Sequence, residues 1–248
     1  MMDYYSYGPD SAGFLLLQPE GEHDETREEK EYELIKKLSG FDDFRLVIIP
    51  VDSWNRDLSP WPAPPVFGKE PFGDGAGRTL RIITEELLPE LQAHSPSGTS
   101  PKIILGGYSL AGLFALWASY EADCFDAAAA CSPSVWFPGF MEYQQEHEIR
   151  TKHVYLSLGD REEKAKNRVF AAVGDCIRES DRLLRERGVN SVLEWNPGNH
   201  FVDGELRTAK GFSWAIRQLQ NSEGLTDNRE LLVEMLETAA DLAEWGVR

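Results

Sequence analysis

One serine of the sequence lies in a setting that could make its hydroxyl a nucleophile. Ser109 stands in the turn Gly106-Gly-Tyr-Ser-Leu-Ala-Gly112, between a short apolar run and an apolar helical pattern. A strand, a sharp turn and a helix in this order expose a serine hydroxyl. Such a turn needs small residues two positions before and after the serine, and Gly107 and Ala111 are small. Ser109 is therefore the candidate nucleophile, and an ordinary strand-to-helix turn is the alternative interpretation.

Three histidines follow Ser109, and one of them is placed to act as its base. A serine hydroxyl attacks only after a base takes its proton. His147 lies in a polar stretch, and His153 opens a predicted strand, at the wrong edge of the sheet. His200 follows a predicted strand, in the turn Asn-Pro-Gly-Asn-His-Phe, as Ser109 follows its own. The carboxyl ends of parallel strands open into one crevice, so we expect His200 and Ser109 to meet there.

The base needs a third group to orient it, and one acidic loop offers three carboxylates for this role. The loop reads Gly-Asp-Arg-Glu-Glu and follows the strand predicted over 154–158. It contains Asp160, Glu162 and Glu163. We select Glu162, because the position three after Gly159 is where such a loop commonly turns back towards the histidine. Asp160 is the alternative.

An oxyanion hole requires two N–H donors aimed at the negative charge that develops on the substrate. The backbone N–H of Leu110, immediately after the nucleophile, is the first candidate. The second is expected from the turn Gln-Pro-Glu-Gly-Glu after the first predicted strand. Pro19 has no N–H, so Gln18 or Glu20 must supply it, and we favour Glu20.

Apolar runs alternate with amphipathic stretches along the whole chain. This alternation predicts an α/β fold, with a mostly parallel central sheet and helices on both faces. The predicted strands are 14–17, 44–51, 102–105, 125–131, 153–158 and 189–195. The predicted helices are 25–38, 78–91, 109–120, 165–187 and 208–219.

The irregular segment 52–77 is rich in proline and aromatic residues. A loop of this length is usually functional when it is ordered. We expect aromatic side chains from it and from 136–137 to line a pocket for the acyl or alcohol part of a substrate. These residues are Trp54, Trp61, Phe67, Trp136 and Phe137. Ordinary packing beneath a long loop is the alternative.

Arg56 of this segment could take part in charge recognition. Its guanidinium could bind a substrate carboxylate through two parallel hydrogen bonds. It could equally pair with Asp52 or Asp57 nearby in the sequence. We favour pairing within the chain.

The length and composition of the chain indicate one domain. The 248 residues, 42% of them hydrophobic, can bury one sizeable core, and we assign residues 1–222 to it. Residues 223–248 are predicted as a C-terminal helical extension, with a helix over 227–245 that has an apolar face. We expect that face to pack on the same domain, and its use in a homodimer is the alternative.

The charge of the chain excludes several classes of partner. The net charge of −17 disfavours nucleic acid and anionic membrane surfaces, since both attract basic proteins. The N-terminus shows no signal-peptide pattern, and no apolar run approaches the length of a membrane span. Together with cysteines that show no disulfide or Cys-x-x-Cys pattern, these features predict a cytoplasmic protein. The scattered histidines and cysteines predict neither a metal site nor a cofactor.

Four segments taken together resemble a known family. They are Gly-Gly-Tyr-Ser-Leu-Ala-Gly-Leu-Phe at 106–114, Ser-Pro-Ser-Val-Trp-Phe at 132–137, Gly-Asp-Arg-Glu at 159–162 and Asn-Pro-Gly-Asn-His-Phe at 196–201. In this order they are similar to the putative esterase family of the α/β-hydrolase superfamily. That family includes enterochelin esterases, feruloyl esterases and esterase D-like enzymes. The resemblance runs from about residue 14 to about residue 219.

The resemblance implies ester hydrolysis through an acyl-enzyme, without a cofactor. Ser109 would be the nucleophile, His200 the base and then the acid, and Glu162 the residue that orients it. The Gly-Asp-Arg-Glu loop is most similar to that of enterochelin esterases, whose glutamate is the triad acid. The segment around Trp54 differs from the family members, so the resemblance implies a small-molecule ester but no particular one.

Two other functions remain compatible with the same residues. An acyltransferase would use the same serine chemistry and pass the acyl group to an acceptor other than water. A catalytically silent binding protein on this fold is the second alternative. It has no need for a serine, an acid and a histidine in the order found here.

Overall fold

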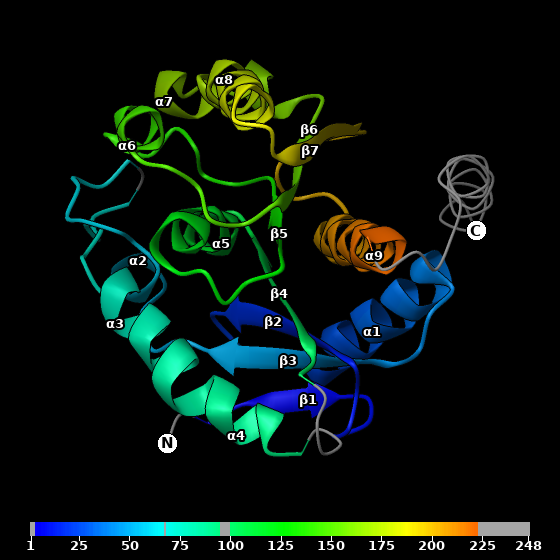
Figure 1. Ribbon diagram of the computed structural model, residues 1–248. Coiled ribbons are helices and arrows are strands. Elements are labelled where there is room, and N and C mark those ends of the chain that lie inside the picture. The colour runs from blue at the N-terminus through cyan, green and yellow to red at the C-terminus, as the bar shows by residue number, and fades with distance from the viewer. Residues whose placement is uncertain (1–2, 67, 95–99, 223–248) are drawn as a thin grey trace.

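The computed structural model describes residues 3–66, 68–94 and 100–222, and these residues surround one seven-stranded sheet (Figure 1). The strands lie in the order β1-β3-β2-β4-β5-β6-β7, and each pair of neighbours is parallel except β1 and β3. They are β1 (Tyr5–Tyr7), β2 (Phe14–Glu20), β3 (Phe44–Pro50), β4 (Lys102–Tyr108), β5 (Ala127–Cys131), β6 (His153–Gly159) and β7 (Asn190–Asn196). The inner strands are continuous apolar runs because both of their faces are covered.

Helices cover both faces of the sheet. On one face lie α1 (Glu25–Ser39) and α9 (Gly204–Ser222), side by side (Figure 1). The other face carries a continuous rod of α3 (Ala76–Arg81), the π-helical η1 (Ile82–Leu87) and α4 (Leu88–Gln92), and also α5 (Leu110–Glu121), α6 (Phe140–Glu146) and α8 (Val173–Glu186). Three short helices lie in the loops after β3 and β6: α2 (Trp54–Asp57), η2 (Glu162–Lys164) and α7 (Arg168–Ala171).

Glycines allow α9 to approach the middle of the sheet closely. A Cβ atom on Gly106 would lie 2.6 Å from the ring of Phe212, and one on Gly211 would lie 2.8 Å from Sγ of Cys131. Neither position can take a larger residue without moving the helix or the sheet. The middle of α9 is thereby held against β4 and β5, and the start of the helix lines a cavity that reaches Ser109.

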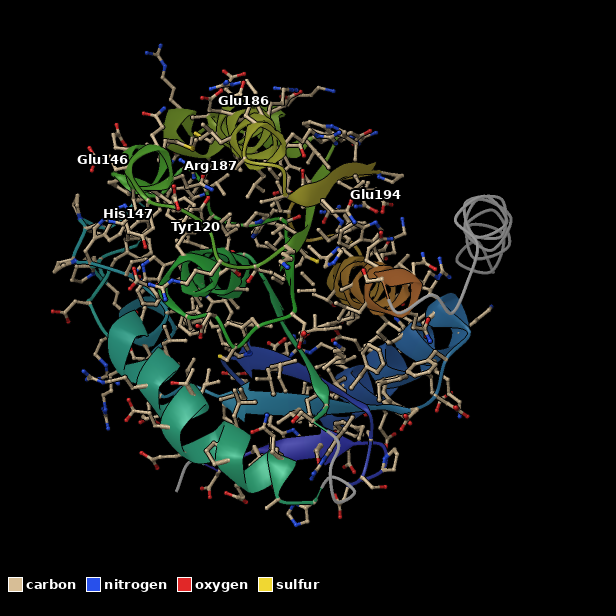
Figure 2. All side chains as sticks on the ribbon, viewed as in Figure 1. Tyr120, Glu146, His147, Glu186, Arg187 and Glu194 are labelled. Atoms are coloured by element: carbon tan, nitrogen blue, oxygen red, sulfur yellow. The ribbon has the colours of Figure 1, made fainter. Side chains whose placement is uncertain are left out.

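Arg187, just after α8, ties that helix to α6. Its guanidinium donates to the backbone oxygens of Gln145 at 2.9 Å and His147 at 2.7 Å. Figure 2 shows Arg187 and His147 close together, near Tyr120 of α5. His147 is exposed at the end of α6, and its backbone oxygen makes this surface contact.

The predicted α/β-hydrolase fold is confirmed, with a mostly parallel sheet and helices on both faces. The structure adds the short strand β1 and the helix α6, which the sequence did not predict. The helix predicted over 165–187 is wrong in its first part: residues 165–167 are not helical, and the short α7 is separate from α8. The predicted helix 227–245, and with it the extension 223–248 and the dimer face, lies outside the described residues. No helix within the described ranges is long and apolar enough to cross a membrane.

Candidate active site

Ser109 sits at a sharp elbow between β4 and α5. Its φ of 59° and ψ of −118° are strained for a residue with a side chain. A Cβ atom on Gly107 would lie only 2.6 Å from the Cβ atom of Ala111, so the small residues expected on both sides of the serine are needed. The elbow is fixed by hydrogen bonds from Ser109 N to Cys131 O and from Ser134 N to Ser109 O, both 3.0 Å.

The imidazole of His200 lies between Ser109 and an acidic residue. Its Nε2 atom is 3.0 Å from Oγ of Ser109, and its Nδ1 atom is 2.7 Å from Oε2 of Glu162. A carboxylate at Nδ1 favours the tautomer with the proton on that nitrogen, which leaves Nε2 free to accept the serine proton. The hydroxyl of Tyr108 donates to the backbone oxygen of His200 at 2.8 Å and holds the turn in place.

Glu162 is buried, with 6% of its surface exposed, and it has a donor for each carboxylate oxygen. While Oε2 faces His200, Oε1 accepts from Gly159 N and Ser132 Oγ, both at 2.8 Å, and from Arg207 at 2.9 Å. Burial by itself raises the pKa of Glu162. The hydrogen bonds from His200, Gly159 and Ser132 and the charge of His200 outweigh that effect, so the pKa lies below its usual value.

The other two carboxylates of the acidic loop have different partners. Asp160 accepts from the backbone N–H of Gly198 at 2.9 Å, and Glu163 pairs with Arg178 at 2.7 Å. Of the three candidates, only Glu162 makes a contact with His200 among the described residues.

Arg207 of α9 joins the parts of this site and was not predicted from the sequence. It is 1% exposed. One terminal nitrogen donates to Oε1 of Glu162, to Tyr108 Oη at 3.0 Å and to Ser132 Oγ at 3.1 Å. The other donates to the backbone oxygens at positions 197 and 199, in the turn that carries the histidine. In the sequence it directly precedes the predicted helix 208–219, and nothing there signalled its burial.

Of the two predicted oxyanion donors, Leu110 directly follows Ser109, and Glu20 lines the same small cavity as Ser109. Leu110 is the first residue of α5, and the N–H groups of a first helical turn have no partner within the helix. Glu20 is the last residue of β2, and its backbone oxygen accepts from Val51 N at 2.8 Å. The role of both N–H groups stays a prediction.

A cavity of about 430 Å³ opens over the serine, and its walls are mainly apolar. Its aromatic lining comes from Trp54, Phe72, Trp136, Phe170 and Phe201. Phe201, next to the histidine, is 91% exposed at the rim.

The predicted pocket residues fall into two groups. Trp54 and Trp136 line the cavity. Phe137 is not among the lining residues: it is buried behind them, edge-on to Phe72 and Trp61. Trp61 donates to a backbone oxygen at position 138, and Phe67 lies outside the described residues.

Arg56 pairs with Asp57, one of the two partners predicted for it within the chain. Its Nε and terminal nitrogen lie 2.7 Å and 3.0 Å from the two carboxylate oxygens. The residue does not line the cavity.

One known protein family matches most of the chain. The model of the family described as "Putative esterase" matches residues 14–200, which include Ser109, Glu162 and His200. The chain belongs to this family. The protein is thus an esterase, and its sheet and helices are those of the α/β-hydrolase superfamily.

Solved structures share the fold of this esterase over most of its length. An IroE-like serine hydrolase from Shewanella oneidensis is 17% identical, with a TM-score of 0.69, over 95% of this chain and 94% of that one. The siderophore hydrolase EstA from Aspergillus nidulans is 18% identical, with a TM-score of 0.62, over 89% and 94%. The enterobactin esterase FES from Shigella flexneri is 13% identical, with a TM-score of 0.58, over 87% and 55%. No curated protein sequence matches the esterase.

Proposed function

We propose that the esterase hydrolyses carboxylic esters of small molecules through an acyl-enzyme, with Ser109, His200 and Glu162 as its catalytic triad. The observation that carries this proposal is the unbroken contact from Ser109 Oγ through His200 to Glu162 beneath the apolar cavity. Ester hydrolysis itself follows from the family.

In the first half of the reaction, His200 Nε2 takes the hydroxyl proton as Ser109 Oγ attacks the ester carbonyl carbon. The negative charge moves to the carbonyl oxygen, where the N–H groups of Leu110 and Glu20 would stabilise it. The C–O bond to the alcohol then breaks, and the imidazolium of His200 donates its proton to the leaving oxygen.

In the second half, water attacks the acyl-enzyme and His200 accepts a proton from it. The serine oxygen leaves, regains its proton and releases the carboxylic acid. Glu162 stays ionised throughout, orients the imidazole and stabilises its positive charge. The low pKa of Glu162 supports this role, because the carboxylate remains charged at neutral pH.

The cavity indicates an apolar or aromatic group next to the scissile bond. Trp136, Phe72 and Phe170 present ring faces and edges around it. Such walls bind apolar surface, and a few polar groups at the base fix the ester. Siderophore esters are one class to test, since solved structures with this fold include hydrolases named for siderophores and enterobactin.

The test combines covalent labelling with turnover. A fluorophosphonate probe is expected to label the wild type and not Ser109→Ala, and aryl esters of increasing acyl length are expected to be hydrolysed by the wild type alone. A folded wild type that is neither labelled nor active would overturn the proposal. Labelling without hydrolysis, with turnover restored by added alcohols or amines, would identify an acyltransferase instead.

A further inference from the structure

A second cavity borders Ser109, and we call it the polar cavity because charged side chains from three elements contribute to its lining. It measures about 210 Å³ and shares Ser109 and Trp54 with the apolar cavity. Its charged lining residues are Glu20 from β2, Arg27 and Glu31 from α1, and Glu205 from α9. An ester bound at Ser109 therefore has different surroundings on its two sides.

Carboxylates outnumber cations around this polar cavity. Arg27 pairs with Glu20 at 3.2 Å, which uses the single guanidinium of the lining. The Glu205 carboxylate makes no ion pair or hydrogen bond with a described residue, although its charge acts on Arg27. When Glu31 is ionised, three carboxylates face the one guanidinium of the lining, and the cavity carries an excess of negative charge.

One carboxylate oxygen of Glu31 is buried and has no hydrogen-bond donor among the described residues. Its side chain is 3% exposed. Oε2 accepts from Gln18 Nε2 at 3.0 Å, whereas Oε1 is buried and accepts a hydrogen bond from none of the described residues. The neighbouring Thr208 hydroxyl donates to the backbone oxygens of Gly204 and Glu205, each at 3.1 Å. When Glu31 is ionised, this buried acceptor without a donor is costly, so a ligand that brings a donor would remove the cost.

These carboxylates are not arranged for a metal ion. No group of three or more His, Cys, Asp or Glu side chains in the described part of the chain could hold one. An organic cation makes smaller demands, because a primary ammonium needs only two or three acceptors and the rest of its molecule can be apolar.

We propose that the polar cavity is a subsite for a primary ammonium group carried by the ester, held by Glu31 and Glu205 while the rest of the substrate occupies the apolar cavity. This inference rests on the proposed function, since it needs an ester at Ser109. The ammonium could belong to the acyl part or to the alcohol part, and the test separates the two.

The ionisation of Glu31 gives the subsite a further signature. Burial is the largest effect on this group and raises its pKa to about 8. Thr208 from α9, Gln18 and Arg27 act to lower it, and Glu20 acts to raise it. An ammonium beside Glu31 would favour the carboxylate and lower its pKa. Binding should therefore release a proton at pH 7 and become stronger between about pH 6 and about pH 8.5, where a primary amine stays protonated.

The test compares matched esters with and without the amine. For the acyl side they are 4-nitrophenyl 6-aminohexanoate and 4-nitrophenyl heptanoate, which have the same chain length. For the alcohol side they are the hexanoates of 4-aminobutanol and of pentanol. The readout is the ratio of kcat/KM for the ammonium ester to that for the neutral ester. In one of the two pairs we expect the wild-type ratio to reach about ten at pH 8, as for one well-placed charged contact.

Substitutions identify the groups that produce this ratio. Glu31→Gln and Glu205→Gln are expected to lower it several-fold, and Glu31→Gln to remove its rise with pH. The control is Glu33→Gln, which changes the net charge equally on the same helix at an exposed position and should leave the ratio unchanged. The catalytic steps at Ser109 are common to both esters of a pair, so their contribution cancels in the ratio. If Glu31→Gln does not fold, Glu205→Gln carries the test.

The two proposals fail in different ways. Wild-type ratios of one or less for both pairs, with rapid hydrolysis of the neutral esters and fluorophosphonate labelling of Ser109, would overturn the ammonium subsite and leave the esterase mechanism standing. A ratio above one that all three glutamate variants retain would place the recognition elsewhere and overturn the subsite as well. Absence of both labelling and hydrolysis would instead overturn the triad.

Discussion

At the scale of single residues, Glu162 performs two tasks with one carboxylate. One oxygen faces the imidazole of His200, and the other is held by Arg207, Ser132 and Gly159. Because the second oxygen is fixed by three donors, the first cannot turn away from the histidine. The three donors that hold Glu162 therefore also set the orientation of the His200 imidazole.

Glu162→Gln keeps the size of the side chain and removes its charge. We expect kcat to fall by about 10³- to 10⁴-fold, because the amide neither fixes the correct tautomer of His200 nor stabilises its cation. Steady-state hydrolysis of an aryl ester measures the loss. The matched control is Asp160→Asn in the same loop, which should retain most of the activity. The reverse pattern would transfer the acid role to Asp160.

Arg207→Met tests the buried guanidinium as a positioning residue. Removing one partner of a buried ion pair costs about 3 kcal/mol, which urea unfolding would detect. Since Arg207 does not line the apolar cavity, kcat is expected to fall while KM stays within about two-fold of the wild type. Arg207→Lys should recover only part of kcat, because lysine cannot reach both Glu162 and the histidine turn. An equal loss in stability with kcat unchanged would reduce the residue to a structural role.

The pH dependence of stability follows from the low pKa of Glu162. A folded-state pKa below the unfolded value, about 4.3 for glutamate, means that the unfolded chain binds the proton more readily. The stability that this group contributes is therefore complete above about pH 5 and is lost as the pH falls through the folded-state pKa. Urea midpoints between pH 6 and pH 3 should fall less steeply for Glu162→Gln than for the wild type. Parallel curves would contradict this assignment.

The sequence predicted the candidate triad residues better than the buried residues that support them. Ser109, His200 and Glu162 each follow a strand, and the geometry of a parallel sheet brings such positions together. Arg207 and Glu31 lie on amphipathic helices among other charged residues, where an exposed position is the ordinary expectation. Glu31 is buried where α1 packs against α9, and Arg207 is buried against Tyr108, Glu162 and the turn that carries His200. Sequence periodicity reveals neither contact.

At the scale of elements, most predicted strands and helices are correct, because long apolar runs and helical stripes are strong signals. The three-residue strand β1 is too short to give such a signal, and the helix α6 is little longer. The loop after β6 forms several short helices, since it must turn Glu162 inward and still reach α8.

Gly107→Ala should damage the elbow. Its new methyl group would lie 2.6 Å from Ala111 Cβ, and overpacking of this kind costs about 1–3 kcal/mol. We expect a lower urea midpoint and slower labelling of Ser109 by the fluorophosphonate. The control is Gly77→Ala in α3, where a methyl group meets no atom within 4 Å. That change should stabilise the protein by about 0.5–1 kcal/mol, because alanine favours a helix. Equal effects of the two substitutions would count against the steric explanation.

At the scale of the whole molecule, a net charge of −17 creates a negative field around the active site. An aryl ester with a sulfonate group should be repelled by it. Raising the NaCl concentration from about 20 mM to about 500 mM shortens the screening length from about 20 Å to about 4 Å. We expect kcat/KM for the anionic ester to rise several-fold over this range, while that for a neutral ester of equal size stays constant. An anionic ester that is insensitive to salt would show that the field does not reach the site.

β1 contributes no buried residue to the core, but it protects the molecule from association with other copies. β1 pairs with Leu46, Val47 and Ile48 of β3, and Ser6 is anchored by Arg45 at 2.8 Å. Without the three residues of β1, the apolar β3 would become an open sheet edge that could pair with a strand from another copy. β1 carries no group of the active site, yet it closes the edge at which the sheet could otherwise grow into an aggregate.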